Sequence, residues 1–202
     1  GESCALMTDA GTPAISDPGE DLVRLCAENG VEVRAIPGCC AAVNALAVSG
    51  LPTGRFTFEG FLTVNKKSRR EHLNSLKGET RTMIFHEAPH KLRTTLNDLT
   101  EAFGPDRRIS LCRELTKLHE EVLRFTLAEA VSYYEENAPK GEYVLVVAGA
   151  APKTGAVVTL EDGVAQVLAL KEQGMRLKDA AKEVAEHTGL SKNELYAAAL
   201  ER

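Results

Sequence analysis

Hydrophobic and polar residues along the first 150 positions form short apolar runs that alternate with amphipathic stretches. Between the runs, apolar residues recur with helical spacing and the pattern stops at glycines, as at Gly30 and Gly104. This alternation predicts an α/β fold, and some connections are too short for a helical crossover, so some strands should pair antiparallel. The runs of strand length are residues 4–7, 31–36, 56–62, 80–85, 108–112, 121–125 and 142–147.

The helices expected between these strands follow the same pattern. Leu22 to Cys26 form an apolar face, and residues 41–49 form a helix of small residues that ends at Gly50. Further helices are expected at residues 70–76, from Pro89 to Phe103, and at residues 128–136.

Breaks in the pattern divide the chain into three parts. Residues 51–54 (Leu-Pro-Thr-Gly) separate residues 1–54, a first α/β domain, from residues 55–150, a second one. Residues 151–202 hold a linker and three short helical patterns, with Gly189 between two of them as in a helix-turn-helix. Ser191 and Glu194 predict a capping box for the last helix. The tail is not basic, which favours a small helical appendage over a module that reads nucleic acid.

The segment from Asp9 to Gly19 is the first candidate site. It follows a strand-like run and leads into a helix, and ligands of open α/β sheets bind at the carboxyl ends of strands. Gly11 would let a ligand approach the backbone, while Asp17 could cap the helix with Pro18 in its first turn. The alternative is a strand-to-helix connection without a function.

Six blocks in order resemble the tetrapyrrole methylase superfamily, the class III S-adenosylmethionine methyltransferases. Within it, the blocks are most similar to the members that methylate a cytidine ribose in small-subunit ribosomal RNA. They cover most of residues 4–150: residues 9–19, 36–52, 58–62, 84–91, 112–117 and 141–147.

The resemblance implies a two-domain α/β enzyme that binds S-adenosyl-L-methionine in a cleft between the domains and methylates a ribose 2′-hydroxyl. Superfamily members begin with a strand and a glycine loop that precede the position of Cys4, so the chain is expected to be a fragment that lacks part of the cofactor domain. Members are commonly homodimers, and the expected partner is small-subunit ribosomal RNA in the assembled subunit.

The resemblance also implies site residues by motif. Carried over in this way, the catalytic candidates are Glu87, Glu114 and Lys117, each of which could equally belong to a surface ion pair. His86 and His90 are further proton acceptors by their ordinary pKa. The implied cofactor contacts are Asp9, Ala10, Gly11, Ile15, Cys40, Ala41 and Ala88.

Charge and composition narrow the picture. The net charge of −5 excludes a chain coated with positive charge, yet residues 66–70 form a dense basic run. The family context favours RNA contacts over a solvated surface loop. The RNA-binding candidates are Lys66, Lys67, Arg69, Arg70 and Lys91.

The remaining composition argues for a cytoplasmic enzyme without metal. The five cysteines are scattered and odd in number, which favours reduced thiols over disulfides or a zinc site. No run of 18 apolar residues occurs, so no membrane span is expected. Two other functions stay open: methylation of a tetrapyrrole or another small molecule, and a non-catalytic RNA-binding or assembly role on the same scaffold.

Overall fold

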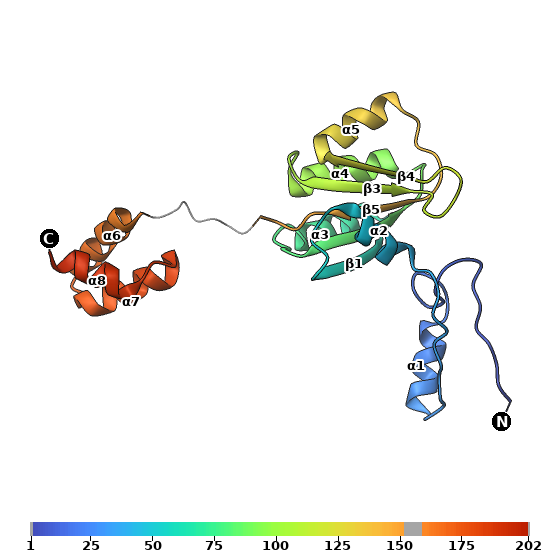
Figure 1. The fold of residues 1–202 in the computed structure, drawn as a ribbon, viewed down its shortest axis with the longest axis horizontal. Helices are drawn as coiled ribbons and strands as arrows, with labels where there is room; N and C mark the ends of the chain where they lie inside the picture. The colour runs from blue at the N-terminus through green and yellow to red at the C-terminus, as the bar shows by residue number, and fades with distance from the viewer. Residues whose placement is uncertain (1, 152–158, 202) are drawn as a thin grey trace. The chain divides into compact units, whose positions relative to one another are not determined.

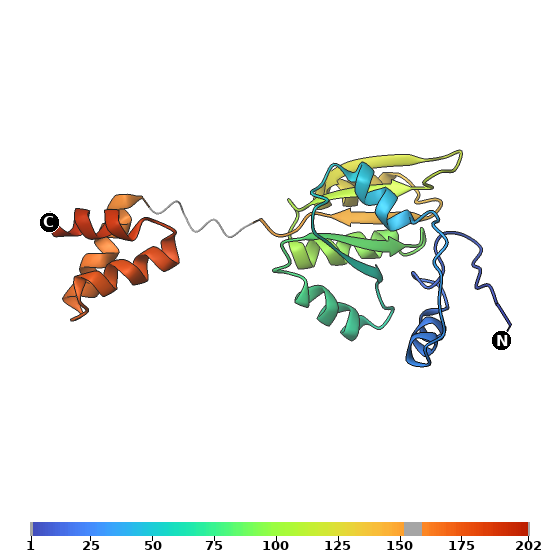
Figure 2. The same ribbon diagram turned by 60° about the horizontal axis from the view of Figure 1, so that its bottom comes forward.

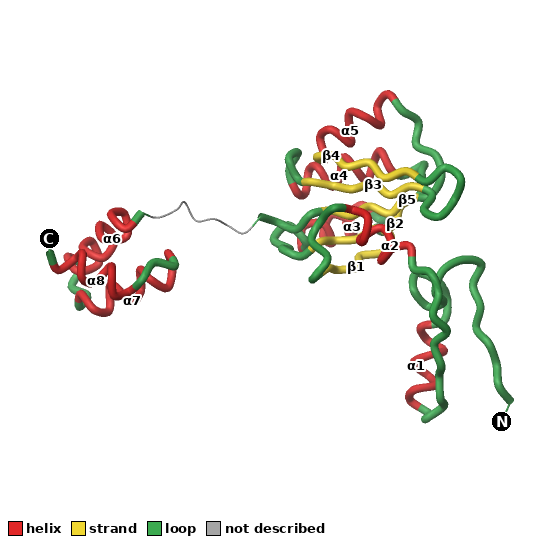
Figure 3. The backbone as a smooth tube through the Cα atoms, in the orientation of Figure 1, coloured by secondary structure: helices red, strands yellow, loops and turns green. Residues whose placement is uncertain are grey.

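The computed structural model describes residues 2–151 and 159–201. Contacts divide the chain into two compact units, Gly1–Ala150 and Ala151–Arg202, and each is described here by itself. Figure 1 gives the order of the elements and Figure 3 their type. The division at residues 54 and 55 expected within the first unit stays a prediction.

A five-stranded mixed sheet forms the centre of the first unit, in the order β1-β2-β5-β3-β4. β1 and β2 are parallel, whereas the other neighbouring pairs are antiparallel, which confirms the expected antiparallel pairing. The bounds are β1 Phe56–Phe61, β2 Thr82–Glu87, β3 Arg108–Arg113, β4 Glu121–Thr126 and β5 Tyr143–Val147.

Helices cover both faces of the sheet, as the two views in Figures 1 and 2 show. Alternate residues of β5 serve the two faces, because successive strand side chains point to opposite sides. Leu145 belongs to a core cluster that also holds residues of α3 (Lys66–Ser75), α4 (Leu92–Phe103) and α5 (Leu127–Glu136), while Val144 and Val146 belong to a second cluster with α2 (Ala41–Ser49). The strands and helices from residue 41 to 147 therefore follow the sequence-based prediction, with small shifts of their ends.

The strands expected at residues 4–7 and 31–36 are absent from the described part of the chain. Both segments are irregular, and Val31, Val33 and Ile36 are exposed. A strand is stable only when a neighbour satisfies its backbone groups, and within the described residues neither segment has such a neighbour. The apolar face of α1 (Glu20–Glu28) likewise buries no residue.

Two expected helix starts differ from the structure. Asp17 does not cap α1: Gly19 occupies the N-cap position, with a φ of 137° and no side-chain cap. The basic run is helical, not a loop, because Asn65 Oδ1 accepts hydrogen bonds from the backbone N–H groups of Lys67 and Ser68 (3.0 and 3.1 Å). This cap satisfies two of the free donors at the start of α3.

The second unit is a three-helix cluster with its own core. Its helices are α6 (Leu160–Glu172), α7 (Leu177–Thr188) and α8 (Lys192–Leu200), packed around residues such as Val167, Ala181 and Leu195. Gly189, at a φ of 74°, ends α7 as expected. Ser191 occupies the N-cap of α8 without a side-chain bond, so the expected capping box is wrong there. Most of the expected linker, residues 152–158, lies outside the described residues.

Two further findings concern the described residues as a whole. No helix among them has the length and hydrophobicity that a membrane crossing requires. All five cysteines are free, and no group of histidine, cysteine and carboxylate side chains in this part of the chain has the arrangement of a metal site.

Candidate functional site

A cleft of about 460 Å³ lies in the first unit, where the loop from Ala10 to Asp17 faces one edge of the sheet. The carboxyl ends of β1, β2 and β3 and the start of the antiparallel β5 meet at this edge, so loops far apart in sequence converge there. Of the predicted site residues, Asp9 does not line the cleft. Those that do are Ala10, Gly11, Ile15, Cys40, Ala41, Glu87, Ala88, Glu114 and Lys117.

Two loops form the amino-terminal wall of the cleft and are joined to each other. Thr12 Oγ1 donates a hydrogen bond to the Cys39 carbonyl oxygen over 3.0 Å. Gly11 has a φ of 80°, a conformation that side chains make costly. A Cβ at Gly11 would lie 3.7 Å from the Cys39 oxygen, which is ordinary contact. The glycine is therefore required by its backbone angle and not by lack of space.

Lys117 lies between two carboxylates on the opposite wall. Its Nζ is 3.0 Å from Glu114 Oε1 and 2.9 Å from Glu142 Oε2. The hydrogen bonds to Glu142 and then Glu114 raise the pKa of Lys117 above its ordinary value. The backbone N–H of Glu142 donates to Glu114 and, with Lys117, lowers the pKa of that carboxyl. The arrangement keeps a cation in the cleft and makes Glu114 a weak base.

Backbone strain is concentrated in the two loops that face each other across the cleft. Among the described residues, the non-glycine residues with positive φ are Ala14, Ser16, Glu114 and Thr116. Such conformations cost free energy and cluster at functional sites, where the surrounding structure holds them. At Glu114, the backbone N–H donates to the Glu142 carbonyl oxygen over 3.0 Å. The strained loop that carries Lys117 is therefore fixed to the start of β5.

Glu87 does not have the open geometry of a catalytic base. It is 4% exposed, and its Oε1 accepts a hydrogen bond from the Ala88 N–H over 2.8 Å. Its Oε2 accepts from Thr95 Oγ1, which in turn accepts from Arg69 Nη2 over 2.7 Å. Because both oxygens are bonded inside the protein, Glu87 holds β2 to α4 in this structure, and its assignment as a catalytic residue stays a prediction.

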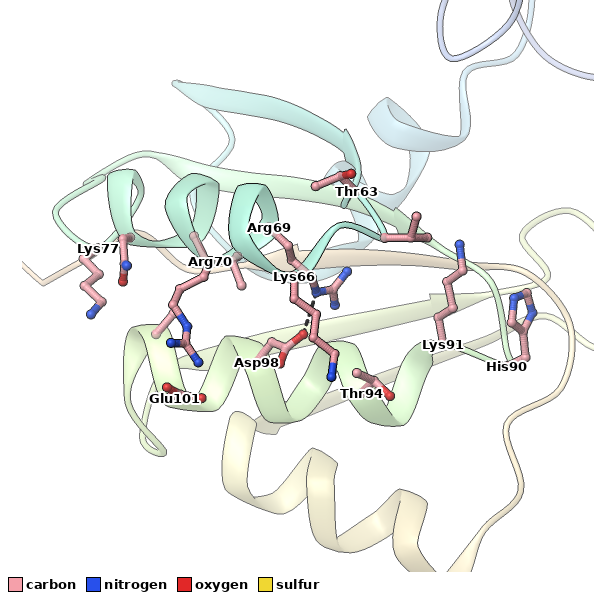
Figure 4. Close-up of a pocket in the computed structure, with 14 residues that line it drawn as sticks. Thr63, Lys66, Arg69, Arg70, Lys77, His90, Lys91, Thr94, Asp98 and Glu101 are labelled. Carbon is pink, nitrogen blue, oxygen red and sulfur yellow. Dashed lines mark hydrogen bonds and ion pairs between the residues drawn. The ribbon is translucent and has the colours of Figure 1, made fainter.

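A second hollow, a groove of about 670 Å³, lies between α3 and α4 (Figure 4). Lys66 and Arg70 extend from α3 toward α4, and Lys91 stands at the start of α4. The lining holds five cationic side chains against the carboxylates Asp98 and Glu101. The groove therefore has a formal surplus of three positive charges, in a chain whose net charge is −5.

The fold places the side chains of the basic run, residues 66–70, in different surroundings. Arg69 is 9% exposed, and its Nε donates to Asp98 Oδ2 over 2.5 Å, so its guanidinium is engaged in an ion pair and its contact with RNA stays a prediction. Lys67 lies outside the groove lining and pairs with Glu71 at 4.0 Å. Side chains on one helix turn point in different directions, which leaves Lys66, Arg70 and Lys91 as the predicted RNA contacts in the groove.

The sequence-based choice of site residues missed Phe61, Glu142 and Tyr143 in the cleft, and named His86 only as a possible proton acceptor. His86 Nε2 is buried and has no hydrogen-bond partner within the described part of the chain. Burial lowers the pKa of His86, although Asp17 and Glu142 oppose the shift. Two sequence signals pointed to Phe61: the block at residues 58–62, and Gly60, an isolated glycine inside a strand of the kind that marks a bulge.

Comparison with family models gives two matches. Residues 1–131 match the model described as Tetrapyrrole (Corrin/Porphyrin) Methylases. Residues 158–202 match the model described as RsmI C-terminal HTH domain. The first match includes most residues of the cleft and the whole α3–α4 groove.

Similar proteins and solved structures point in the same direction. The chain is 45% identical over 201 residues to "Ribosomal RNA small subunit methyltransferase I" of Synechocystis sp., covering 100% of this chain and 72% of that protein. It is 42% identical to the protein of that name in Escherichia coli O157:H7, covering 100% of the chain and 70% of the relative. The crystal structure of the methyltransferase CobJ has a similar fold, with a TM-score of 0.53 and 23% identity. That match covers 70% of this chain and 62% of the CobJ chain.

Proposed function

Because the chain belongs to the tetrapyrrole methylase family, we propose that it is an S-adenosyl-L-methionine-dependent methyltransferase acting on small-subunit ribosomal RNA. The more specific proposal is transfer to the 2′-hydroxyl of a cytidine ribose. The match to ribosomal RNA small subunit methyltransferase I of two organisms over the whole chain supports the RNA substrate. The basic groove between α3 and α4 agrees with this substrate, because lysine and arginine side chains contact the phosphates of nucleic acids.

The cleft has the size and chemistry that the cofactor requires. Its volume lies within the usual range of about 300–1,000 Å³ for ligand sites. Ala10, Gly11 and Ala41 offer backbone and small side chains to a ligand lying against the wall, while Asp17 supplies negative charge opposite a cation. When bound, S-adenosyl-L-methionine supplies a methyl group carried on a positively charged sulfur.

Lys117 is the residue on which the proposed chemistry depends. A hydroxyl is a poor nucleophile, and its oxygen gains negative charge as its proton passes to solvent water and it attacks the methyl carbon. The new oxygen–carbon bond forms as the bond from that carbon to sulfur breaks, and the sulfur leaves as a neutral thioether. A fixed ammonium group stabilises that charge without reorganising at the moment of reaction. Glu114 and Glu142 hold the ammonium in position and keep it protonated, so we assign Lys117 the role of stabilising the oxygen. Glu114 is then a positioning residue.

The finer statements about partners and location follow from the same function. We propose that the RNA is recognised in the assembled small subunit, that the enzyme is a homodimer, and that it acts in the cytoplasm, where ribosomal subunits are modified. The α3–α4 groove supplies phosphate contacts through Lys66, Arg70 and Lys91. The second unit, with its match to a helix-turn-helix model, is a further part available for RNA contact.

The single observation that supports the function most strongly is the cation held between two carboxylates in a cleft whose other wall has the tight glycine loop. The test incubates the protein with S-adenosyl-L-methionine labelled in its methyl group and with small subunits that lack this modification. Ribose methylation is then located by mass spectrometry of nuclease fragments. Label on a cytidine 2′-oxygen is the expected result. Label on a base, or on uroporphyrinogen in place of RNA, would contradict the proposal.

A further inference from the structure

Three of the six phenylalanines in the chain lie exposed on one edge strand. Phe56, Phe58 and Phe61 of β1 are 41%, 40% and 58% exposed, whereas the other three phenylalanines are buried or partly buried. Leaving a large ring in water forfeits the free energy that burial would give, about 1.5–3 kcal/mol for a side chain of this size. Packing in the core of the first unit therefore does not explain why these three positions are phenylalanine.

A bulge in β1 brings two of the three rings to the same place. The register with β2 slips between Phe58 and Gly60, and Gly60 has a φ of 63°. In a regular strand, residues three apart point to opposite faces. Here both Phe58 and Phe61 lie against His86, with ring centroids 5.2 and 5.4 Å from the imidazole and nearly perpendicular planes. Bulges commonly redirect a side chain next to an active site.

The bulge directs Phe61 toward the cleft. Phe61 and His86 both line the cleft, and so does Lys117 from the loop after β3. An exposed aromatic face at the mouth of a cleft suits a flat partner better than a chain of methylenes. A nucleobase is such a partner, because each base has a π-face that stacks on aromatic rings.

The cleft and the α3–α4 groove are neighbours along the chain. Phe61 lines the cleft, and Thr63 and Val64, two and three residues later, line the groove. The loop after β2 repeats this pattern, since Pro89 lines the cleft and His90 lines the groove. A strand of RNA can therefore pass from one to the other across two short loops.

The charges of the groove complement such a strand. Lys66 lies in the first turn of α3, where a positive charge is unfavourable because the helix dipole is positive at that end. A cation placed against the dipole is explained by an anionic partner. Figure 4 shows Lys66 and Arg70 on the groove side of α3, four residues apart and so on one face of the helix.

We propose that Phe61, backed by Phe58 and His86, is a stacking platform for a nucleobase beside the reacting ribose. The same single strand continues into the α3–α4 groove, where Lys66 and Arg70 contact its phosphates. The inference rests on the proposed function and goes beyond it, because it assigns how the base is held and which way the strand leaves the cleft. A duplex cannot use this platform, since its bases are already stacked on one another.

The test separates base contacts from backbone contacts with two probes of equal length and charge. One is a decamer of cytidylate, and the other is the same ribose-phosphate chain without bases. Stacking predicts that the wild-type protein prefers the cytidylate by on the order of 10-fold, which is within the range measured for aromatic platforms. Phe61→Ala should abolish this preference, and Phe61→Trp should keep it. Lys66→Ala with Arg70→Ala should weaken binding of both probes equally.

Phe56→Ala is the matched control, because Phe56 is also an exposed ring (41% against 58% for Phe61) and lies at the other end of the same strand. It should leave the preference unchanged, and circular dichroism should show that each variant is folded. A preference that survives Phe61→Ala, or that Phe56→Ala removes equally, would overturn the platform. So would a change in oligomeric state of Phe61→Ala without a change in preference, which would assign the rings to an interface between two copies.

The failure of the platform and the failure of the proposed function give different results. A wild-type protein that methylates ribosomal subunits but binds both probes equally refutes the platform alone. A protein that shows the Phe61-dependent preference but transfers no methyl group to RNA refutes the proposed function and retains the platform.

Discussion

Arg69 Nε donates to Asp98 Oδ2 over 2.5 Å, and this ion pair joins α3 to α4. Arg69 is nearly buried, whereas the Asp98 side chain is about a third exposed (32%). Breaking a fully buried pair by removing one partner costs roughly 3–5 kcal/mol. Because Asp98 retains some contact with water, we expect Arg69→Met to lower the free energy of unfolding by an amount at the lower end of that range.

Urea unfolding followed by tyrosine fluorescence measures this loss, since three of the four tyrosines lie in the first unit. Arg70→Met is the matched control, because the neighbouring arginine forms no ion pair within the described residues. Surface substitutions of that kind usually change stability by less than about 0.5 kcal/mol. Equal stability of the two variants would mean that the Arg69–Asp98 pair contributes nothing to the packing of α3.

The salt dependence of RNA binding should measure how many cations of the groove contact phosphates. Each phosphate contact to a single strand contributes about 0.7 to the slope of log affinity against log salt concentration. Lys66→Ala with Arg70→Ala should therefore reduce the slope by about 1.4. Filter binding of a labelled decamer at several salt concentrations measures it. Lys67→Ala, on the same helix but outside the groove lining, should leave the slope nearly unchanged; a similar reduction would place RNA on the outer side of α3.

Lys117→Ala should slow methyl transfer far more than it weakens binding. Removing one preorganised group that stabilises a developing oxyanion costs about 10²–10³-fold in rate. Single-turnover methylation with saturating RNA and cofactor measures this step, and calorimetry gives the two affinities. Lys182→Ala removes an exposed lysine that also lies near a carboxylate, Glu186, and should leave the rate unchanged. A nearly wild-type rate for Lys117→Ala would exclude the lysine from the mechanism.

The pKa of Lys117 should fall when Glu142 is neutralised. Glu142 is the largest cause of the raised pKa, and Glu114 the second, so Glu142→Gln should have the larger effect. A raised pKa favours folding below the ordinary lysine value near 10.4, and this contribution is lost as pH rises through the higher folded value. NMR titration of ¹³C-labelled lysine measures the change. An upward shift in Glu142→Gln would contradict the geometry of the ion pair.

The pKa of His86 should lie below its ordinary value, whereas that of Lys117 lies above its own. Burial is the main cause of its lowered pKa, so the neutral ring is the form that the fold stabilises. Its contribution to stability is present above the unfolded value of about 6.5 and is lost as pH falls toward the lower folded value. Proton–carbon NMR of the ring should show a midpoint below that of the same residue in urea. A midpoint above the urea value would mean that Asp17 and Glu142 outweigh burial.

The pattern of apolar residues is sufficient to predict the elements between residues 41 and 147. The alternation of apolar residues in segments such as residues 143–147 is a local property of the chain, and it predicted the strands and the mixed pairing of the sheet. The family blocks also located most of the cleft, because residues at strand ends come together whenever the strands form one sheet. Ala88 and Lys117, which follow β2 and β3, line the same cleft for this reason.

Which of the predicted side chains are already engaged inside the protein becomes visible only in the folded chain. Arg69 and Arg70 are neighbours in an unbroken basic run, and what separates them is Asp98, which lies 29 residues beyond Arg69 on another helix. Glu87 is held by Thr95 in the same way, and the bulge that turns Phe61 toward the cleft depends on the register of β1 against β2. Residues 31–36 have a strand-like sequence but no neighbour to pair with among the described residues. Hydrophobic pattern is encoded locally, whereas ion pairing, burial and strand pairing depend on groups that only the folded chain brings within reach.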